Sequence, residues 1–238
     1  MREGRRRVSV VVDLKHVRAL TSIEAKADGG WRIGAAATIG AMRKHAAFAA
    51  VHGALLDSAG LIGSLQVQNR ASLGGNLCNA APSADGVPLL IALDAEAEIH
   101  GPAGERRAPA AAIPTGPGRT SLGPGEVLAA LHLPPRAART ADRYFRFTPR
   151  REMDIAVAGS GVRIDLADDG RIRAAAIVLA SVGPIPIRAG MAAKALVGTH
   201  PSAAAFAEAG AIAAGEAQPI SDTRGSADYR RDLVAVLT

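Results

Sequence analysis

The chain has 238 residues, of which 48% are hydrophobic and 21% charged, so it is long enough for one large domain or two small ones. The hydrophobic fraction excludes a disordered chain, and no apolar run approaches the roughly 20 residues of a membrane-spanning helix. The apolar stretch after the basic amino terminus is too short for a secretory signal. The single cysteine, Cys78, excludes a disulfide framework and a cysteine-built metal site. We therefore expect a cytoplasmic protein with no membrane span.

The net charge of +6 is mostly a matter of arginine usage. Only four of the 28 basic residues are lysines, and the arginines are scattered along the whole chain. Aromatic residues make up 3%, too few for the stacking surfaces on which single-stranded nucleic acids bind. The sequence therefore predicts no nucleic-acid partner.

The first hundred residues predict short strands and helices. Val8–Asp13 is β-branched and typical of a strand, and Asp28-Gly29-Gly30 marks the turn of a hairpin. Thr38 is a candidate N-cap for a helix that runs to Phe48. The other elements expected here are a helical turn at 15–20, helices at 54–61 and 88–93, and a strand at 95–100.

Two stretches interrupt this pattern. Residues Gly63–Asp85 are small and polar, and we interpret them as a long loop, which in a compact domain is usually functional. Residues Gly101–Gly125 are rich in proline, glycine and alanine and predict a connector. We therefore place a domain boundary between residues 125 and 126.

The second half predicts strands first and helices afterwards. Strands are expected at 126–133, 143–147, 155–166 and 171–182, with a hairpin turn at Asp168-Asp169-Gly170, and helices at 189–197, 202–214 and 226–237. Because strands and helices are segregated along the chain, the order favours an α+β fold over a doubly wound sheet.

Gly74-Gly75 is the most suggestive pair in the long loop. Adjacent glycines permit a positive φ and let a ligand approach the main chain without a Cβ in the way. Consecutive amides in such a turn suit a pyrophosphate, Ser72 and Asn76 add side-chain hydrogen bonds, and Asp85 can accept from a sugar hydroxyl. The alternative is an ordinary tight turn with helix caps. The glycine spacing excludes a Rossmann fingerprint.

Four segments, in order along nearly the whole chain, carry a more specific signal. Together they resemble the FAD-binding (medium) subunits of molybdenum hydroxylases, of the xanthine dehydrogenase and carbon monoxide dehydrogenase types. The segments are Trp31–Thr38, Gln66–Leu77 with Ala81–Asp85, Arg150–Ala156, and Ser221–Arg231.

The resemblance implies a fold and a role. Residues 1–125 correspond to the second subdomain of a PCMH-like molybdopterin dehydrogenase FAD domain, and residues 126–238 to the α+β C-terminal domain of the CO dehydrogenase flavoprotein type. Such subunits bind FAD and receive electrons from iron–sulfur clusters on a small subunit. Those clusters receive their electrons from a large molybdopterin-binding subunit. The flavin then passes electrons to an acceptor such as NAD or a quinone.

The resemblance also suggests site residues, all for cofactor binding and none catalytic or metal-binding. The glycine loop would hold the FAD phosphates and Asp85 a sugar or ribityl hydroxyl. Ile62 lies where the family places a residue against the cofactor, although a core position is the alternative. Arg146 stands where the family often has a lysine near the flavin, or else is an exposed strand arginine. The loop residues are Ser72, Leu73, Gly74, Gly75 and Asn76.

The chain departs from the family pattern at its start. Family members open with a small subdomain that carries a first glycine-rich loop, and here only Met1–Arg7 precedes the expected strand at Val8. We expect this subdomain to be absent from the chain, through a misplaced start or a shortened gene. The alternative function is therefore a truncated scaffold of the same complex that does not bind flavin.

Overall fold

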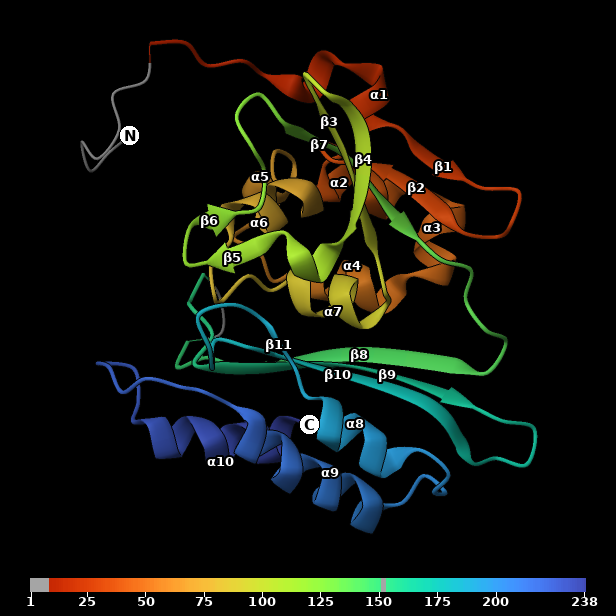
Figure 1. Cartoon of the computed structure of the whole chain (residues 1–238), viewed down its shortest axis with the longest axis vertical. Helices are drawn as coiled ribbons and strands as arrows, with labels where there is room; N and C mark the ends of the chain where they lie inside the picture. The colour runs from red at the N-terminus through yellow and green to blue at the C-terminus, as the bar shows by residue number, and fades with distance from the viewer. Residues whose placement is uncertain (1–8, 151–152) are drawn as a thin grey trace.

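The computed structural model describes residues 9–150 and 153–238, which form two larger antiparallel sheets, each with its own helices, and one two-stranded sheet (Figure 1). The first sheet has the strand order β1-β2-β7-β3-β4, and the second β11-β10-β9-β8. Helices α8, α9 and α10 cover the face of the second sheet that is turned away from the rest of the chain (Figure 1). The α+β prediction is confirmed.

The N-terminal half, residues 9–133, builds the first sheet from two hairpins with β7 between them. Its strands are β1 (Ile23–Ala25), β2 (Trp31–Gly34), β3 (Glu96–Gly101), β4 (Gly104–Pro109) and β7 (Val127–Leu133), and β5 (Pro114–Gly116) pairs separately with β6 (Arg119–Thr120). Its helices are η1 (Leu14–His16), α1 (Arg18–Thr21), α2 (Ile39–Lys44), α3 (Ala46–Val51), α4 (Gly53–Ala59), α5 (Leu65–Gln68), α6 (Leu73–Asn79), α7 (Val87–Ala92) and η2 (Ala110–Ala112).

The C-terminal half, residues 140–238, closely follows the predicted pattern. Its strands are β8 (Thr140–Phe147), β9 (Ala158–Leu166), β10 (Ile172–Ala180) and β11 (Ile187–Arg188), and its helices are α8 (Gly190–Leu196), α9 (Ala203–Glu216) and α10 (Ala227–Leu237). Gly170 has φ +81° in the turn between β9 and β10, as the Asp-Asp-Gly sequence predicts. No described helix has the length and apolarity to span a membrane.

Both stretches interpreted as irregular contain secondary structure. The polar loop at 63–85 holds α5 and α6, whose N-caps Ser64 and Ser72 each accept a hydrogen bond from the backbone amide three residues later. These helices are too short to show a hydrophobic period. The connector at 101–125 holds β4, an edge strand whose side chains are almost all exposed, so its sequence shows no apolar alternation.

The strand expected at Val8–Asp13 is not observed. Val8 lies outside the described residues, and residues 9–13 are not in a strand. The side chains of Val10, Val11 and Val12 are about 70% exposed. β-Branched residues favour strands where they pack on a neighbouring surface, and no described residue covers these three to that extent.

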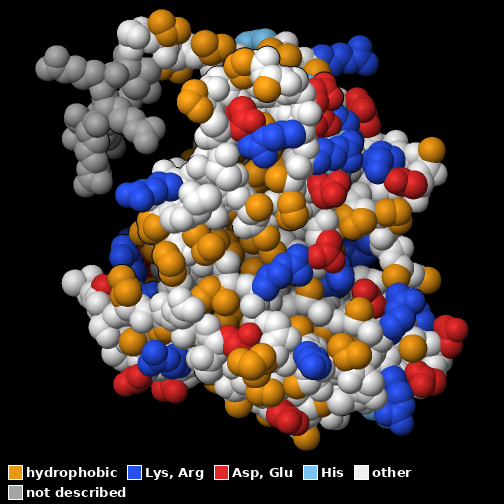
Figure 2. All heavy atoms as spheres, viewed as in Figure 1, with side chains coloured by type: hydrophobic (Ala, Val, Ile, Leu, Met, Phe, Trp, Pro, Cys, Tyr) orange, Lys and Arg blue, Asp and Glu red, His pale blue; other side chains and the backbone are white. Residues whose placement is uncertain are grey.

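β7 belongs to the first sheet rather than to the second. It pairs with β2 and β3 at the centre of the first sheet, so it groups with the N-terminal half, later than the boundary expected at 125/126. The connection 134–139 then leads into the second sheet. Figure 2 shows basic and acidic side chains interspersed over the visible face of both halves.

One face of β8 meets the N-terminal half. Thr140, Asp142, Tyr144 and Arg146 alternate along the strand, and side chains two residues apart lie on the same face. On the neighbouring strand β9, a Cβ at Gly161 would come within 2.9 Å of Pro88 in α7, so the two halves are in close contact there. This polar face of β8 positions part of the site described below.

Candidate functional site

The glycine loop is the first turn of α6. The Ser72 Oγ atom accepts a hydrogen bond from the Gly75 amide at 3.0 Å and caps the helix. Both glycines are helical, and neither has a positive φ. The conformational freedom expected of the pair is therefore not what this turn requires.

The two glycines have different surroundings. A Cβ at Gly74 would lie 2.4 Å from the Ala35 carbonyl oxygen, so close backbone packing requires glycine at this position. A Cβ at Gly75 would meet only the Ser72 Oγ atom, at 3.1 Å, and it would otherwise project into a cavity. Gly75 is thus the glycine that leaves room for a ligand.

A cavity of about 400 Å³ lies beside this turn. Ser72, Gly74, Gly75 and Cys78 line one side, and residues 12–15 and 126–128 line another. Among the described residues, the Gly74 amide makes no hydrogen bond to a backbone carbonyl outside α6. A helix first turn with a side-chain-free surface fits a phosphate group, so this part of the site is compatible with a dinucleotide cofactor.

Asn76, Leu73 and Ile62 hold the following loop in place. The Asn76 Oδ1 atom accepts from the Gly86 amide at 3.1 Å, and a Cβ at Gly86 would come within 2.6 Å of Leu73 and 3.7 Å of Ile62. Leu73 is fully buried in the core of the N-terminal half, and Ile62 packs against the same core. Of the two alternatives for Ile62, the structure contains the core contact.

Asp85 and Arg146 form a buried ion pair across the two halves. The Asp85 Oδ2 atom accepts from an Arg146 guanidinium nitrogen at 2.6 Å, and Oδ1 accepts from the Tyr144 hydroxyl at 3.0 Å. Asp85 is 7% exposed, and burial raises its pKa to about 6 although Arg146 and Tyr144 oppose the change. Burial, with the neighbouring Asp85 carboxylate, raises the pKa of Tyr144 well above its usual value. Arg146 is therefore a buried cation rather than an exposed strand arginine.

A second cavity, of about 500 Å³, opens beside Arg146. It is lined by the 60–68 segment, by Arg43 and by Met153, whose φ is +52°. Gln68 is buried in its wall, where its Oε1 accepts from Arg43 at 3.0 Å and its Nε2 donates to the Gly60 carbonyl at 2.7 Å. The eight predicted residues are thus divided among the glycine-loop cavity, the connecting loop and the Arg146 cavity.

Sequence reasoning missed three residues of this region. Tyr144 precedes Arg146 by two positions in a predicted strand, so the period of two could have indicated that both face Asp85. No local pattern marks Arg43 and Gln68, because they lie on two different helices and are 25 residues apart in the chain.

The motif segment Ser221–Arg231 has a structural role. Arg230, which is 4% exposed, donates to the Val157 carbonyl at 2.7 Å, to the Ser181 carbonyl at 3.0 Å and to Asp222 at 2.7 Å, and so fastens α10 to the second sheet. In the motif segment Arg150–Ala156, Arg151 and Glu152 lie outside the described residues.

Burial raises the pKa of the Cys78 thiol to about 11, which disfavours a reactive thiolate.

Comparison with known families assigns both halves. Residues 1–136 match the family model described as the FAD binding domain in molybdopterin dehydrogenase. The chain belongs to this family. Residues 143–238 match the CO dehydrogenase flavoprotein C-terminal domain, and the two matches meet at the connection between the sheets. The family resemblance inferred from the four motif segments is confirmed.

Relatives of this flavoprotein family align over most of the chain. The xanthine dehydrogenase FAD-binding subunit of Escherichia coli O157:H7 is 30% identical over 229 residues, which is 96% of this chain and 78% of the relative. The carbon monoxide dehydrogenase medium chain of Afipia carboxidovorans is 33% identical over 177 residues, 74% of this chain and 61% of the relative.

Solved structures give the same result. A Cu,Mo-CO dehydrogenase chain superposes with a TM-score of 0.88 at 30% identity, covering 94% of this chain and 78% of that one. Quinoline 2-oxidoreductase from Pseudomonas putida 86 gives 0.86 at 29% identity, with 94% and 77% covered. The chain is therefore an FAD-binding subunit of the molybdenum hydroxylase family, its relatives are oxidoreductase subunits, and the FAD prediction is confirmed.

Proposed function

We propose that this subunit carries electrons through FAD from iron–sulfur clusters on a small partner subunit to an acceptor such as NAD or a quinone. A large molybdopterin-binding subunit would supply electrons to the clusters. The complex would work in the cytoplasm. The glycine-loop cavity carries this proposal, because a side chain at Gly75 would project into it from the first turn of α6. The bound FAD supplies the redox chemistry, and the chain supplies binding and electrostatics.

The α6 turn would bind the phosphates. Ser72 and Gly74 line the cavity, and Gly75 allows close approach to the main chain. A hydrogen bond to a charged oxygen contributes about 1.5–3 kcal/mol, so a few such contacts anchor an anionic group. Asn76 and Leu73 act indirectly, because they hold the turn against the loop at Gly86.

Asp85 and Arg146 would face the flavin end. Arg146 places a fixed cation at the wall of the second cavity, where low solvent access strengthens its effect on a negatively charged group. Asp85 holds that cation in place and keeps lone pairs that can accept from a sugar or ribityl hydroxyl. Ile62 would contribute apolar packing beneath the loop. We also propose that the two functional domains divide within residues 134–139.

The glycine loop is tested by Gly75→Val, with Gly190→Val as its matched control. Gly190 begins α8, and a Cβ there meets nothing within 4 Å. Because valine at Gly75 obstructs the cavity, we expect FAD affinity, measured by calorimetry on the full chain, to fall roughly tenfold or more. Gly190→Val should bind like the parent, and both variants should keep the parental circular dichroism spectrum.

Two results would go against the proposal. Unchanged FAD affinity in Gly75→Val would exclude the α6 turn as the phosphate site. A parental chain that takes up no FAD, alone or with its partner subunits, would instead favour the alternative of a scaffold that does not bind flavin.

A further inference from the structure

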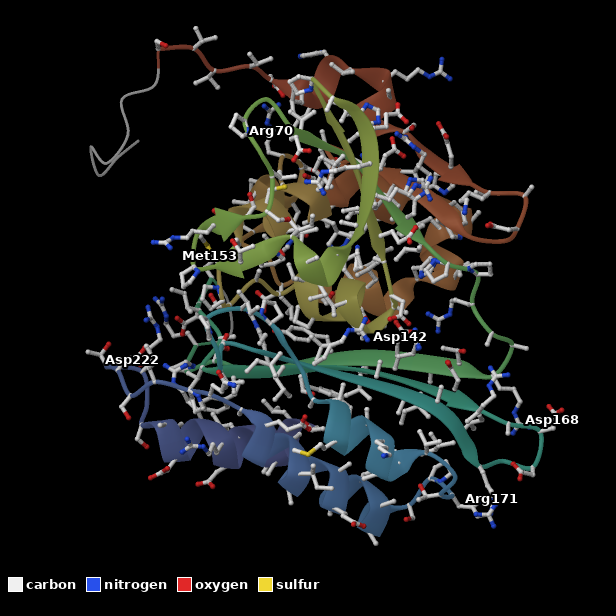
Figure 3. All side chains as sticks on the ribbon, viewed as in Figure 1. Arg70, Asp142, Met153, Asp168, Arg171 and Asp222 are labelled. Atoms are coloured by element: carbon white, nitrogen blue, oxygen red, sulfur yellow. The ribbon has the colours of Figure 1, made fainter. Side chains whose placement is uncertain are left out.

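The Arg146 cavity has two basic side chains in its lining, Arg146 and Arg43. Arg146 comes from β8 in the second sheet, and Arg43 comes from the last turn of α2 in the N-terminal half. Met153, which is labelled in Figure 3, belongs to the same lining where the two halves meet. Among the described residues, no aspartate or glutamate lines this cavity. The two arginines therefore set the charge of its wall.

The charges of these two arginines are balanced differently. The Arg146 guanidinium lies 2.6 Å from the Asp85 carboxylate, and both side chains are buried. Arg43 is exposed, and its side chain donates to the neutral amide oxygen of Gln68 at 3.0 Å. Within residues 9–150 and 153–238, Arg43 forms no ion pair with a carboxylate. Asp85 thus cancels much of the field of Arg146, whereas no described carboxylate cancels that of Arg43.

Arg43 is held in place by buried surroundings. Its acceptor Gln68 is 4% exposed and is itself anchored, because its Nε2 atom donates to the Gly60 carbonyl at 2.7 Å and to the Ile62 carbonyl at 3.3 Å. A Cβ at Gly60 would collide with a terminal guanidinium nitrogen of Arg43, so glycine makes room for that group. A side chain that is already fixed loses little further freedom when it acts on an anion.

The neighbouring Lys44 lacks these features. It is also exposed and in the last turn of α2, but it does not line the cavity, and its side chain makes no hydrogen bond to a described residue. Lys44 fits the ordinary role of a solvated surface cation. Arg43 differs from it because its guanidinium is fixed at the cavity wall.

We propose that Arg43 acts on the bound flavin, because its unbalanced charge favours the reduced, negatively charged form. This inference rests on the proposed function, in which the flavin end of FAD faces the Arg146 cavity. A flavin that takes up two electrons and one proton carries one more negative charge, and a fixed cation nearby stabilises that charge. Arg146 would mainly hold Asp85, and Arg43 would supply the net positive charge of the site.

The test is the reduction equilibrium of FAD bound to the full chain at pH 7.5, measured against a redox dye of known potential. Arg43→Gln removes the charge but keeps a hydrogen-bonding side chain. At a fixed potential, we expect the ratio of reduced to oxidised flavin to fall roughly threefold to tenfold. For a two-electron couple this fall lowers the potential by about 15–30 mV. Because Arg43 is exposed, the difference from the parent should shrink as salt is raised from about 0.05 M to about 0.5 M.

Three further variants separate charge from position. Lys44→Gln is the matched control, since it removes one positive charge outside the lining, and its ratio should stay close to that of the parent. Arg43→Lys keeps the charge and should retain most of the parental ratio. Gly60→Ala keeps Arg43 but displaces the flexible end of its side chain, and Gly60 has φ −67°, which alanine adopts without strain. We expect Gly60→Ala to show a smaller fall than Arg43→Gln.

The proposal would be overturned by a parental ratio in Arg43→Gln or in Gly60→Ala, or by an equal fall in Lys44→Gln. A fall in Arg43→Gln that salt does not change, or that Arg43→Lys shares, would also overturn it, because it would be structural rather than electrostatic. Calorimetry of FAD binding distinguishes these results from a failure of the proposed function. A parental chain that takes up no FAD would refute that function and this inference with it.

Discussion

The buried polar groups at the two ends of the β8 face differ in whether they have hydrogen-bond partners. At one end the Asp85 carboxylate has a partner for each oxygen, Tyr144 and Arg146. At the other end the His52 ring has a described partner for neither nitrogen. A fully hydrogen-bonded buried network makes a position rigid, whereas a buried polar group without a partner costs free energy. The same strand thus takes part in a satisfied ion pair at one end and lies near a buried ring without described hydrogen bonds at the other.

The largest expected effect comes from breaking the satisfied end. Arg146→Met leaves the Asp85 carboxylate buried without its cation, and removing one partner of a buried pair typically costs about 3–5 kcal/mol. Urea unfolding should show a loss of this size. Arg143→Met is the matched control on the same strand, since Arg143 is exposed and its contact with Asp57 is 3.4 Å, so its loss should stay below about 1 kcal/mol. Equal losses in both variants would contradict the buried-pair interpretation.

Acidification should also change the stability contributions of the two ends in opposite directions. His52 has a pKa of about 4 in the folded protein and near 6.5 when unfolded, so its contribution is present above pH 6.5 and is lost as the pH falls through 4. Between pH 7 and pH 4.5 the parent should therefore lose about 2–3 kcal/mol of unfolding free energy through this histidine. His52→Phe should not show this loss when both proteins are unfolded in urea. A pH dependence identical to that of the parent would show that His52 is not buried as a neutral ring.

Asp85 should act in the reverse direction and with a slightly smaller effect. Its pKa of about 6 in the folded protein lies above the usual 3.8, so its contribution is present below pH 3.8 and is lost as the pH rises through 6. Asp85→Asn should therefore lose about 2 kcal/mol more than the parent on acidification from pH 7 to pH 4.5. A smaller loss than the parent's would mean that Arg146 keeps this carboxyl ionised.

The smallest effect should come from filling the unsatisfied end at neutral pH. His52→Phe removes two buried nitrogens without described partners, and replacing such a group by an apolar one of similar shape is nearly neutral or stabilising. At pH 7.5 in chloride, we expect the free energy of unfolding to change by no more than about 1 kcal/mol. A loss comparable to that of Arg146→Met would show that the ring is satisfied in solution and would remove the contrast between the ends.

Much of the fold could be predicted because its elements carry local signals. The β1–β2 hairpin, the Thr38 cap, strands β7 to β10 and helices α8 to α10 follow from turn residues, N-caps and hydrophobic alternation. The elements missed were short or exposed, such as α5, α6 and β4, and such elements have no apolar period. The membership of β7 in the first sheet was not predictable, because strand pairing is a long-range property.

The sequence by itself determined the α+β class, the glycine turn with its capping serine, and the family and cofactor through four motif segments. Only the tertiary structure decided how those residues are used. It placed Asp85 on an arginine 61 residues away, assigned close packing to Gly74 and ligand access to Gly75, and enclosed His52 beside the connection between the halves. The reason is physical. Propensities and turn chemistry act between neighbours in the chain, whereas desolvation and charge pairing depend on which surfaces the docked sheets bring together.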